Sequence, residues 1–339
     1  MPDRRSESRT HMQSDVLTTR ERPFAVGVDV GGTKIVAGVV DVNGQVHSRI
    51  KLPTDTSKPE MTLRSIANAI EQAIQAGGAS PSAIQGIGLG IPGQVDPQRG
   101  ICLLSVNLNW HNVAVKDWLE QRFGLSCALE NDVSAGALGE YRYGGAANAD
   151  MVYLSLGTGI AARVIHEGRL YRGSHGLAGE IGHTIFVPGG PRCSCGGLGC
   201  LEALAGGPAL ARNAETRLQS GQTSCLQETF VRQGRLSAEQ VFEAARLEDA
   251  LALQVLEEAG MHLAYAINVL AMTFDPQEVV LGGGLALEEG PLTEVIRRGL
   301  HYWLEQTPIL REILTPESLR LSALQRDAGI LGAAALIHI

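Results

Sequence analysis

A carboxylate followed by a pair of glycines stands near the start of the chain, in the sequence Asp-Val-Gly-Gly-Thr-Lys at residues 29–34. Glycines at a tight turn leave backbone N–H groups open to an anion, because no side chain obstructs the approach. The residues predicted to bind phosphate are Gly31, Gly32, Thr33 and Lys34, and Asp29 is placed to hold a magnesium ion. The spacing is not that of the phosphate loop GxxxxGK[ST], and no helical pattern follows it. Taken alone, such a pair of glycines is more often only a turn.

Two further glycine turns strengthen the interpretation of the first. Each follows a short apolar run that predicts a buried strand. Together the three turns would bind the phosphates of a nucleotide from two opposite sides. They would also leave a flat surface for the nucleoside. Their residues are Gly157, Thr158 and Gly159 in the second turn and Gly282, Gly283 and Gly284 in the third.

Asn131 and Asp132 lie between a predicted strand and a predicted helix, where side chains often point into a cleft. Asp at such a position commonly does no more than cap the helix. The alternative for Asp132 is a general base that takes the proton of a substrate hydroxyl during phosphoryl transfer, with Asn131 hydrogen-bonded to a sugar. At this point both interpretations stay open.

Four metal-binding side chains follow the pattern H-x9-C-x-C-x4-C, with glycines and prolines between them. Three thiolates and one imidazole fill the four tetrahedral positions of zinc, so the pattern predicts a closed structural site rather than a hydrolytic one. The predicted zinc ligands are His183, Cys193, Cys195 and Cys200. Glu180 and Glu202 flank them, and they could accept hydrogen bonds from sugar hydroxyls or be solvated surface charges.

The elements that must position these groups form two similar series. In the first, strands at 24–30 and 34–41 enclose the glycine turn, and Asn43-Gly44 predicts a hairpin. In the second, strands at 152–156 and 160–165 enclose the turn at Gly157, and Glu167-Gly168 predicts another hairpin. The repeated order of strand, glycine turn, strand and hairpin predicts a duplicated lobe, with two lobes facing each other across a cleft.

Hydrophobic periodicity predicts the remaining elements. The predicted helices are 61–76, 115–123, 133–141, 203–218, 237–245, 250–274, 292–306 and 328–337, and the other strands are 84–90, 125–129 and 278–281. The polar residues 1–22 are predicted to be a disordered tail. We expect a small lobe at 23–130, joined by the final helix at 327–339, and a large lobe at 131–326 with a zinc knuckle at 183–202.

The composition favours a soluble α/β protein with a small-molecule partner. A chain of 339 residues is too long for one ordinary core and fits two lobes. Its net charge of −8, without any basic run, argues against a nucleic-acid partner. No apolar run approaches the roughly 20 residues of a membrane span, and no apolar core follows the first arginines as a secretory signal requires. We therefore expect a cytoplasmic protein without a membrane partner.

Taken together, these motifs resemble those of the ROK family of sugar kinases and sugar-responsive repressors, on the actin-like, ribonuclease-H-like fold. The resemblance covers nearly the whole chain after residue 23 and is carried by the groups at 29–34, 90–93, 107–110, 130–132, 157–159, 179–183, 193–202 and 282–284. It implies that Asp132 is the catalytic base in contact with the sugar. The other sugar ligands that it implies are Asn131, Glu180, His183 and Glu202, with Gly93 and Asn107 nearby. His183 would use one ring nitrogen for zinc and the other for the sugar.

The resemblance also implies transfer of the γ-phosphoryl group of Mg-ATP to a hexose hydroxyl, usually the 6-hydroxyl, with lobe closure that excludes water. Glucose is the leading acceptor, N-acetylmannosamine and fructose are alternatives, and the implied role is in carbohydrate metabolism, at glycolysis. A homodimer or homotetramer is implied as well. One departure is present: where the family's kinases usually continue with glycines, this chain has Ala161, Ala162 and Arg163. Arg163 could crowd the nucleotide, point outward or reach a phosphate.

Two other functions compete with the kinase. A sugar-sensing repressor of the family adds a DNA-binding helix-turn-helix, and the polar residues before Phe24 are expected to be too few for one. A sugar-binding protein without catalysis is conceivable because of Arg163. Asp29, Asp132 and the three glycine turns favour catalysis instead.

Overall fold

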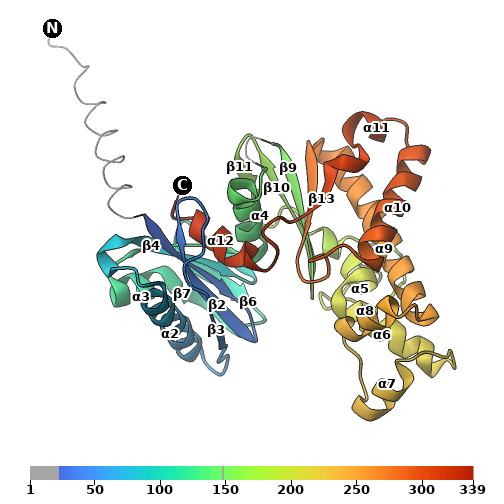
Figure 1. Ribbon diagram of the computed structural model, residues 1–339, viewed down its shortest axis with the longest axis horizontal. Coiled ribbons are helices and arrows are strands. Elements are labelled where there is room, and N and C mark those ends of the chain that lie inside the picture. Colours follow the sequence, from blue (N-terminus) through green and yellow to red (C-terminus); the bar gives the residue numbers. More distant parts are fainter. Residues whose placement is uncertain (1–22, 147–148, 339) are drawn as a thin grey trace, which may run out of the picture. The chain divides into compact units, whose positions relative to one another are not determined.

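The computed structural model describes residues 23–146 and 149–338, so the predicted tail at 1–22 lies outside the described residues. The chain forms two compact units, which Figure 1 follows by colour along the sequence. Unit 1 ends at Gly145 and includes the chain again from Asp327, and unit 2 is Ala146–Arg326. This boundary differs from the predicted one at residue 130, because α4 (Asp132–Tyr143) packs on the last helix, α12 (Ala328–Ala335), within unit 1.

Unit 1 is built on a five-stranded sheet with the strand order β3-β2-β1-β4-β8. β1 and β2 form an antiparallel hairpin, and β4 and β8 continue the sheet parallel to β1. The elements of the sheet are β1 (Phe24–Val30), β2 (Lys34–Asp41), β3 (Ile50–Pro53), β4 (Ile84–Ile91) and β8 (Ser126–Asn131). Valine and isoleucine side chains of these strands pack with α2 (Pro59–Gly77) and α3 (Val115–Phe123) in one hydrophobic core. The predicted bounds of β1, β2 and α3 are confirmed.

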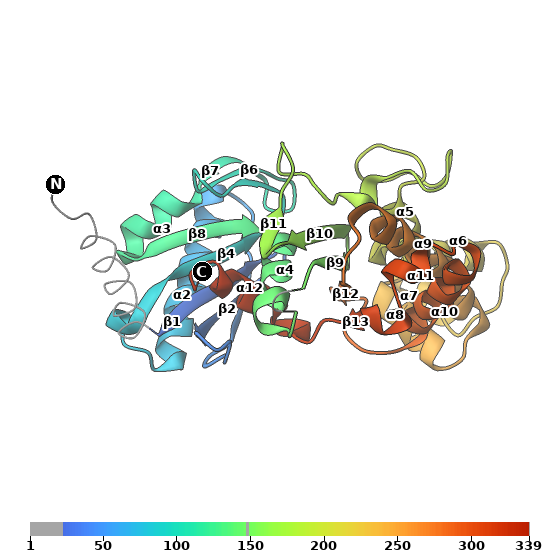
Figure 2. The same ribbon diagram turned by 90° about the horizontal axis from the view of Figure 1, so that it is seen from above.

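A row of glycines crosses the opposite face of this sheet, which explains part of the glycine excess of the chain. Gly38, Gly27 and Gly88 are paired neighbours on β2, β1 and β4. A Cβ atom at Gly27 or Gly88 would come within 2 Å of a backbone oxygen of α12, at 1.9 Å and 1.8 Å respectively. Only a surface without side chains admits the helix this closely. Figure 2 shows α12 beside β1, β2 and β4.

A second sheet of unit 1 was not predicted. Its strands are β5 (Gln94–Asp96), β6 (Ile101–Ser105) and β7 (Trp110–Ala114), in the order β5-β6-β7. The strands have three to five residues, and exposed and buried positions do not alternate regularly along them. Periodicity therefore gave no signal for these residues. The sheet matters for the site because it presents Gly93 before β5 and Asn107 between β6 and β7.

Unit 2 repeats the topology of the first sheet, which confirms the predicted duplication. Its strand order is β11-β10-β9-β12-β13, with an antiparallel hairpin of β9 and β10 and with β12 and β13 parallel to β9. The strands are β9 (Met151–Leu156), β10 (Ile160–His166), β11 (Arg169–Tyr171), β12 (Glu278–Gly282) and β13 (Leu319–Leu321). The hairpin predicted at Glu167-Gly168 is present, since both residues have positive φ.

Helices form the rest of unit 2, and the long helix α9 lies at their centre. They are α5 (Leu201–Ala205), α6 (Gly207–Gln219), α7 (Gln227–Gln233), α8 (Ala238–Arg246), α9 (Ala250–Phe274), α10 (Pro291–Gln306) and α11 (Leu310–Ile313). The prediction of a single helix at 203–218 is wrong. Gly206 is extended, with φ −71° and ψ 160°, and Pro208 in the first turn of α6 favours a new helix start.

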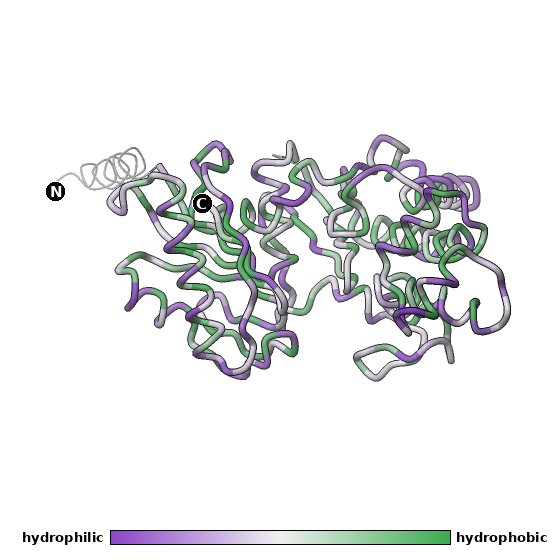
Figure 3. The backbone as a smooth tube through the Cα atoms, turned by 60° about the horizontal axis from the view of Figure 1, so that its bottom comes forward, coloured by the Kyte–Doolittle hydropathy of each residue, from purple (hydrophilic) through white to green (hydrophobic). Residues whose placement is uncertain are grey.

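The short 3₁₀ turns are η1 (Pro81–Ala83), η2 (Ile181–His183), η3 (Pro316–Ser318) and η4 (Gln325–Asp327). Hydrophobic residues concentrate in the central strands and packed helices of each unit, and hydrophilic residues in their turns (Figure 3). No helix among the described residues has the length and apolarity needed to cross a membrane.

Candidate active site

The carboxyl ends of β1, β4 and β8 meet at one edge of the sheet in unit 1. Asp29 pairs with Gly90, and Gly90 pairs with Glu130, so the three residues form one row across the strands. A Cβ atom at Gly90 would lie 3.4 Å from the Cα atom of Asp132. Asp132 therefore lies close to Gly90, at the same sheet edge as Asp29.

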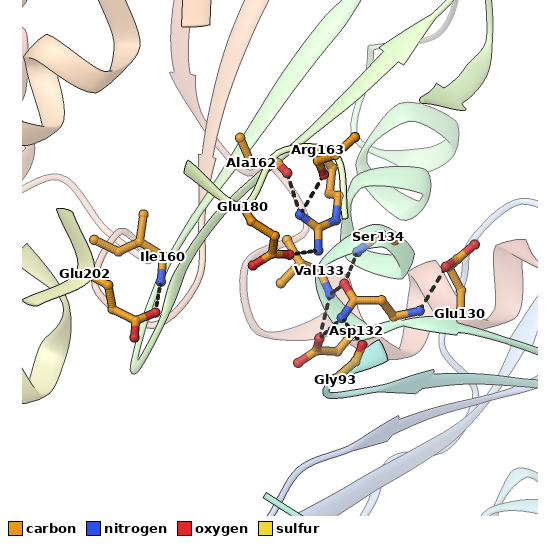
Figure 4. A network of polar contacts seen from close by, with 12 residues as sticks. Gly93, Glu130, Asp132, Val133, Ser134, Ile160, Ala162, Arg163, Glu180 and Glu202 are labelled. Atoms are coloured by element: carbon orange, nitrogen blue, oxygen red, sulfur yellow. Dashed lines mark hydrogen bonds and ion pairs between the residues drawn. The ribbon is translucent and has the colours of Figure 1, made fainter. Parts of the chain in front are cut away.

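Asn131, not Asp132, caps α4. The Asn131 Oδ1 atom accepts hydrogen bonds from the backbone N–H groups of Val133 and Ser134, both at 3.1 Å. Its Nδ2 donates to the carbonyl oxygen of Gly93 at 3.1 Å and to Oδ1 of Asp132 at 3.0 Å (Figure 4). The Asp132 carboxylate also accepts from the Val133 N–H at 3.0 Å, so Asn131 is the N-cap, Asp132 shares one of its donors, and the amide of Asn131 orients the Asp132 carboxylate.

Residue 93 has a backbone conformation that requires glycine. Its φ of 112° is one that other residues rarely adopt, and a Cβ atom there would come within 2.2 Å of the Leu104 carbonyl oxygen on β6. This close contact fixes the residue before β5 against β6 within the second sheet. The Gly93 carbonyl is thereby held where the Asn131 amide can donate to it.

Asp29 is partly buried at the end of β1, and its surroundings shift the pKa of its carboxyl group strongly. Burial, together with the negative charge of Asp132, raises the pKa of Asp29 to about 6, and Lys34 and Arg49 oppose this shift. The first turn of α12 lies against the carboxylate, since a Cβ atom at Gly329 would be 2.6 Å from the Asp29 carboxyl carbon. Two interacting carboxylates at one sheet edge are an arrangement that suits a divalent cation.

The glycine turn of unit 1 is a tight hairpin beside Asn107. The Gly31 N–H donates to the Lys34 carbonyl at 2.8 Å, and Thr54 Oγ1 donates to the Gly31 carbonyl at 2.7 Å. A Cβ atom at Gly32 would be 2.9 Å from the Asn107 carbonyl oxygen. The structure therefore places Asn107 next to the turn. Within the described residues, the N–H groups of Gly32 and Thr33 have no partner and are open to an anion.

The two glycine turns of unit 2 lie side by side at the ends of β9 and β12. In the first, the Gly157 N–H donates to the Gly159 carbonyl at 3.0 Å. In the second, Gly283 has φ 84°, and a Cβ atom there would be 2.4 Å from the Leu156 carbonyl oxygen. The Leu285 N–H donates to that same oxygen at 2.9 Å. The sequence predicted both turns, and the structure brings them together.

A cavity of about 250 Å³ adjoins the second of these turns, between α8 and the start of α10. Its lining includes Gly284, the apolar side chains Phe242 and Leu285, and the cations Arg246 and Arg326. Four glutamates, Glu239, Glu243, Glu288 and Glu289, line it as well, so apolar side chains and charges of both signs share the wall of this cavity. Except for Gly284, the sequence indicated none of these residues, because the pattern of α8 predicts only a helix that packs in the core.

The four predicted zinc ligands converge in unit 2. The Sγ atoms of Cys195 and Cys200 are 3.7 Å apart, and Sγ of Cys193 is 3.7 Å from Nδ1 of His183. One ligand atom from each of the four residues lies within 4.8 Å of every other. Tetrahedral zinc with Zn–S bonds of about 2.3 Å separates its ligand atoms by roughly 3.8 Å, whereas a disulfide would need about 2.05 Å. The spacing therefore fits a metal site and leaves Nε2 of His183 for another partner.

Glu202, in the first turn of α5, connects the cysteine loop with the glycine turn. Its Oε1 accepts a hydrogen bond from Ser194 Oγ at 3.1 Å, and its Oε2 accepts from the Ile160 N–H at 3.2 Å (Figure 4). A Cβ atom at Gly159 would be 2.9 Å from Oε2. Glu202 is thus not a solvated surface charge, and both of its oxygens are oriented by the protein.

Arg163 does not point outward. Its side chain is only 5% exposed, and its Nη2 donates to Oε1 of Glu180 at 2.8 Å. Glu180 immediately precedes η2, which ends at His183. The His183 N–H donates to the Glu180 carbonyl at 3.1 Å, so the two residues stand at the two ends of one tight turn. The structure therefore brings together two of the predicted sugar ligands and the arginine that departs from the family pattern.

Two sheets of the same strand order, with a glycine turn at the end of the first strand of each, define the actin-like, two-domain kinase fold. The chain belongs to the ROK family, whose sequence model matches residues 25–339. It is 33% identical to a glucokinase of Halalkalibacterium halodurans over 92% of this chain and 94% of that one. A ROK glucokinase of Streptomyces griseus, solved with glucose and AMPPNP, is 33% identical with a TM-score of 0.76, over 92% of this chain and 98% of that one.

The family also contains regulators, and these are similar to this chain as well. A xylose repressor of Bacillus subtilis is 31% identical over 82% of this chain and 68% of the repressor. Family membership therefore establishes the fold, and the choice between catalysis and regulation depends on the residues of the site.

Proposed function

We propose that this protein is an ATP-dependent hexose kinase that transfers the γ-phosphoryl group of ATP to a sugar hydroxyl, with glucose as the main acceptor and glucose 6-phosphate as the product. The observation that carries the proposal is Asp132, oriented by Asn131 at the same sheet edge as Asp29. A regulator that only binds sugar has no need of two interacting carboxylates beside a phosphate-binding turn. The glucokinase relatives, similar over nearly their whole length, support the same function.

In this proposal the residues of unit 1 supply the base and the metal site. Asp132 accepts the proton of the attacking hydroxyl, which makes the oxygen a better nucleophile as it approaches phosphorus. Asn131, itself bonded to the Gly93 carbonyl, holds that carboxylate in one orientation. Asn107, beside the glycine turn, would contact the sugar. Asp29 would hold Mg²⁺, which neutralises charge on the phosphates when it is bound.

The residues of unit 2 would bind the nucleotide and the sugar. The turns at Gly157–159 and Gly282–284 would hold phosphates with Thr158 beside them, as would Gly31, Gly32, Thr33 and Lys34 in unit 1. The cavity beside Gly284 would take the nucleoside. Glu180, the Nε2 of His183 and Glu202 would accept or donate hydrogen bonds at the sugar hydroxyls.

Zinc at His183, Cys193, Cys195 and Cys200 would be structural, since it would tie η2 to the loop that leads into α5. We therefore expect metal removal to weaken sugar binding by at least about tenfold, because Glu180, His183 and Glu202 would lose their fixed positions. Calorimetric titration with glucose before and after chelation measures the change, and re-addition of zinc should restore binding. Active enzyme without stoichiometric zinc in elemental analysis would contradict the assignment.

A coupled assay of ADP release over a panel of sugars tests the proposed function. We expect glucose to give the highest kcat/KM, with N-acetylmannosamine and fructose clearly lower. Sugar binding without any sugar-dependent ADP release would instead favour the regulator. A dimeric or tetrameric assembly, a cytoplasmic location and a role in glycolysis stay predictions from the family resemblance and the sequence.

A further inference from the structure

Arg163 on β10 makes three hydrogen bonds to the segment that carries Glu180 and to its own strand. Its Nη1 donates to the carbonyl oxygens of Ala162 at 2.7 Å and Ala178 at 3.3 Å, and its Nη2 donates to Oε1 of Glu180 at 2.8 Å. Figure 4 shows the guanidinium between Ala162 and the Glu180 carboxylate. Because a guanidinium is a planar fork with donors in fixed directions, these acceptors determine its orientation.

The backbone of the same segment is fixed against β10. The Ala162 N–H donates to the Gly179 carbonyl at 2.7 Å. Gly179 has φ 86°, and a Cβ atom there would lie 2.0 Å from the Ala162 carbonyl oxygen. Backbone and side chain of Glu180 are therefore both constrained, the first through Gly179 and the second through Arg163.

Arg163 also limits what the Glu180 carboxylate can bind. A carboxylate with two available oxygens can accept hydrogen bonds from two neighbouring hydroxyls of a sugar. Here Oε1 already accepts from Arg163 and keeps only one acceptor position, whereas Oε2 has no hydrogen-bond partner among the residues that the structure describes. The Glu180 side chain is 34% exposed, so a ligand can reach it. Glu180 thus offers Oε2 as its fully open acceptor, and the bond from Arg163 fixes the direction in which Oε2 points.

We propose that Arg163 is a positioning and specificity-determining residue, which fixes Glu180 as the acceptor for a single sugar hydroxyl. The inference rests on the proposed function, because that function assigns Glu180 to the sugar. It explains the departure from the family's glycines as a change in sugar recognition rather than an obstacle to the nucleotide. The protein should then discriminate strongly at one hydroxyl position and weakly at the neighbouring one.

Calorimetric binding of glucose and of the single-deoxyglucoses tests this inference without requiring catalysis. For the wild type we expect one deoxyglucose to bind about tenfold or more weakly than glucose, because it lacks a hydrogen bond to a charged group. The deoxyglucose modified at the neighbouring position should bind nearly as well as glucose. Arg163→Met keeps the buried stem but frees Oε1. It should weaken glucose binding about tenfold and make two neighbouring deoxy positions sensitive, with the calorimetric affinity for ATP unchanged.

Three further variants separate positioning from general stability. Arg163→Lys retains the charge and should recover part of the affinity. In Glu180→Gln the amide oxygen can still accept from Arg163, and discrimination at the single sensitive position should fall. This variant therefore tests the inference even if Arg163→Met does not fold. Arg320→Met removes another arginine–glutamate pair of the same sheet, 2.7 Å from Glu278, and should leave glucose affinity unchanged.

A wild-type deoxy profile in Arg163→Met, or equal losses for sugar and ATP, would overturn the inference. Absence of phosphoryl transfer would not have this effect, because the readout is sugar affinity. The inference and the kinase function can therefore fail separately.

Discussion

Replacing Asp132 by asparagine should lower kcat for sugar phosphorylation by about 10³-fold while glucose affinity changes less than about threefold. A positioned general base contributes roughly 10²–10⁴ to the rate, and asparagine cannot accept the proton. The substitution preserves the side-chain shape, and an amide oxygen can still accept from the Val133 N–H, as the carboxylate does at 3.0 Å. A loss of kcat without a loss of binding is the pattern of an interaction needed only in the transition state. Steady-state kinetics and calorimetry of the same preparation measure both.

Asp117→Asn is a matched control for this variant. Asp117 is an exposed acid in the first turn of α3, as Asp132 is an acid in the first turn of α4. It should leave kcat unchanged, because it has no contact with the candidate site. Wild-type kcat in Asp132→Asn would remove Asp132 from the role of base.

Replacing Asp29 by asparagine should have opposite effects on activity and stability. Turnover with Mg-ATP should fall by on the order of 10²-fold, since a neutral amide is a weaker ligand for Mg²⁺ than a carboxylate. Without nucleotide or metal, the free energy of unfolding at pH 7.5 should rise by about 1–3 kcal/mol, as follows from a pKa raised to about 6. Urea unfolding and steady-state kinetics measure the two effects. A destabilised Asp29→Asn protein would contradict the electrostatic description of this site.

The pH dependence of that stability gain has a definite sign. The pKa of Asp29 is about 6 in the folded protein and 3.8 without perturbation, so between these values the folded state binds the extra proton. The wild type therefore loses stability as the pH rises through this window, and the advantage of Asp29→Asn should fall to about half at pH 5 and largely vanish below about pH 4. Asp41→Asn is the control of opposite sign. Burial raises the pKa of Asp41, but hydrogen bonds from Gln45, His47 and Asn43 together outweigh it and lower the pKa, so replacement of Asp41 should destabilise the protein at pH 7.5.

Local patterns predicted the elements that hold the phosphate-binding turns. β1, β2, α3 and α9 have the predicted bounds, because apolar runs that end at glycine, or at an acid that caps a helix, have few alternative structures. The duplicated strand order and the convergence of the cysteines also followed from residue spacing. The element bounds and the strand order depend on residues that are close in sequence, and the cysteine cluster follows a specific metal-ligand spacing.

Features that depend on tertiary contacts were not predictable in this way. The sheet of β5, β6 and β7 has short, irregularly buried strands, and the break at Gly206 depends on a single extended residue. Asn131 and Asp132 are equally good caps by residue type, and only the hydrogen bonds from the Val133 and Ser134 N–H groups show that Asn131 is the N-cap. The sequence shows that Arg163 departs from the family pattern. Its bond to Glu180, however, depends on how η2 packs on β10.

The most direct test of the kinase function follows the phosphoryl group itself. Protein incubated with glucose, Mg²⁺ and ATP labelled at the γ-phosphate should transfer the label to the 6-hydroxyl of glucose, with little released as inorganic phosphate, and Asp132→Asn should do so about 10³-fold more slowly. Label that stays on ATP, or that appears only as inorganic phosphate while glucose is bound, would contradict the proposal of a hexose kinase.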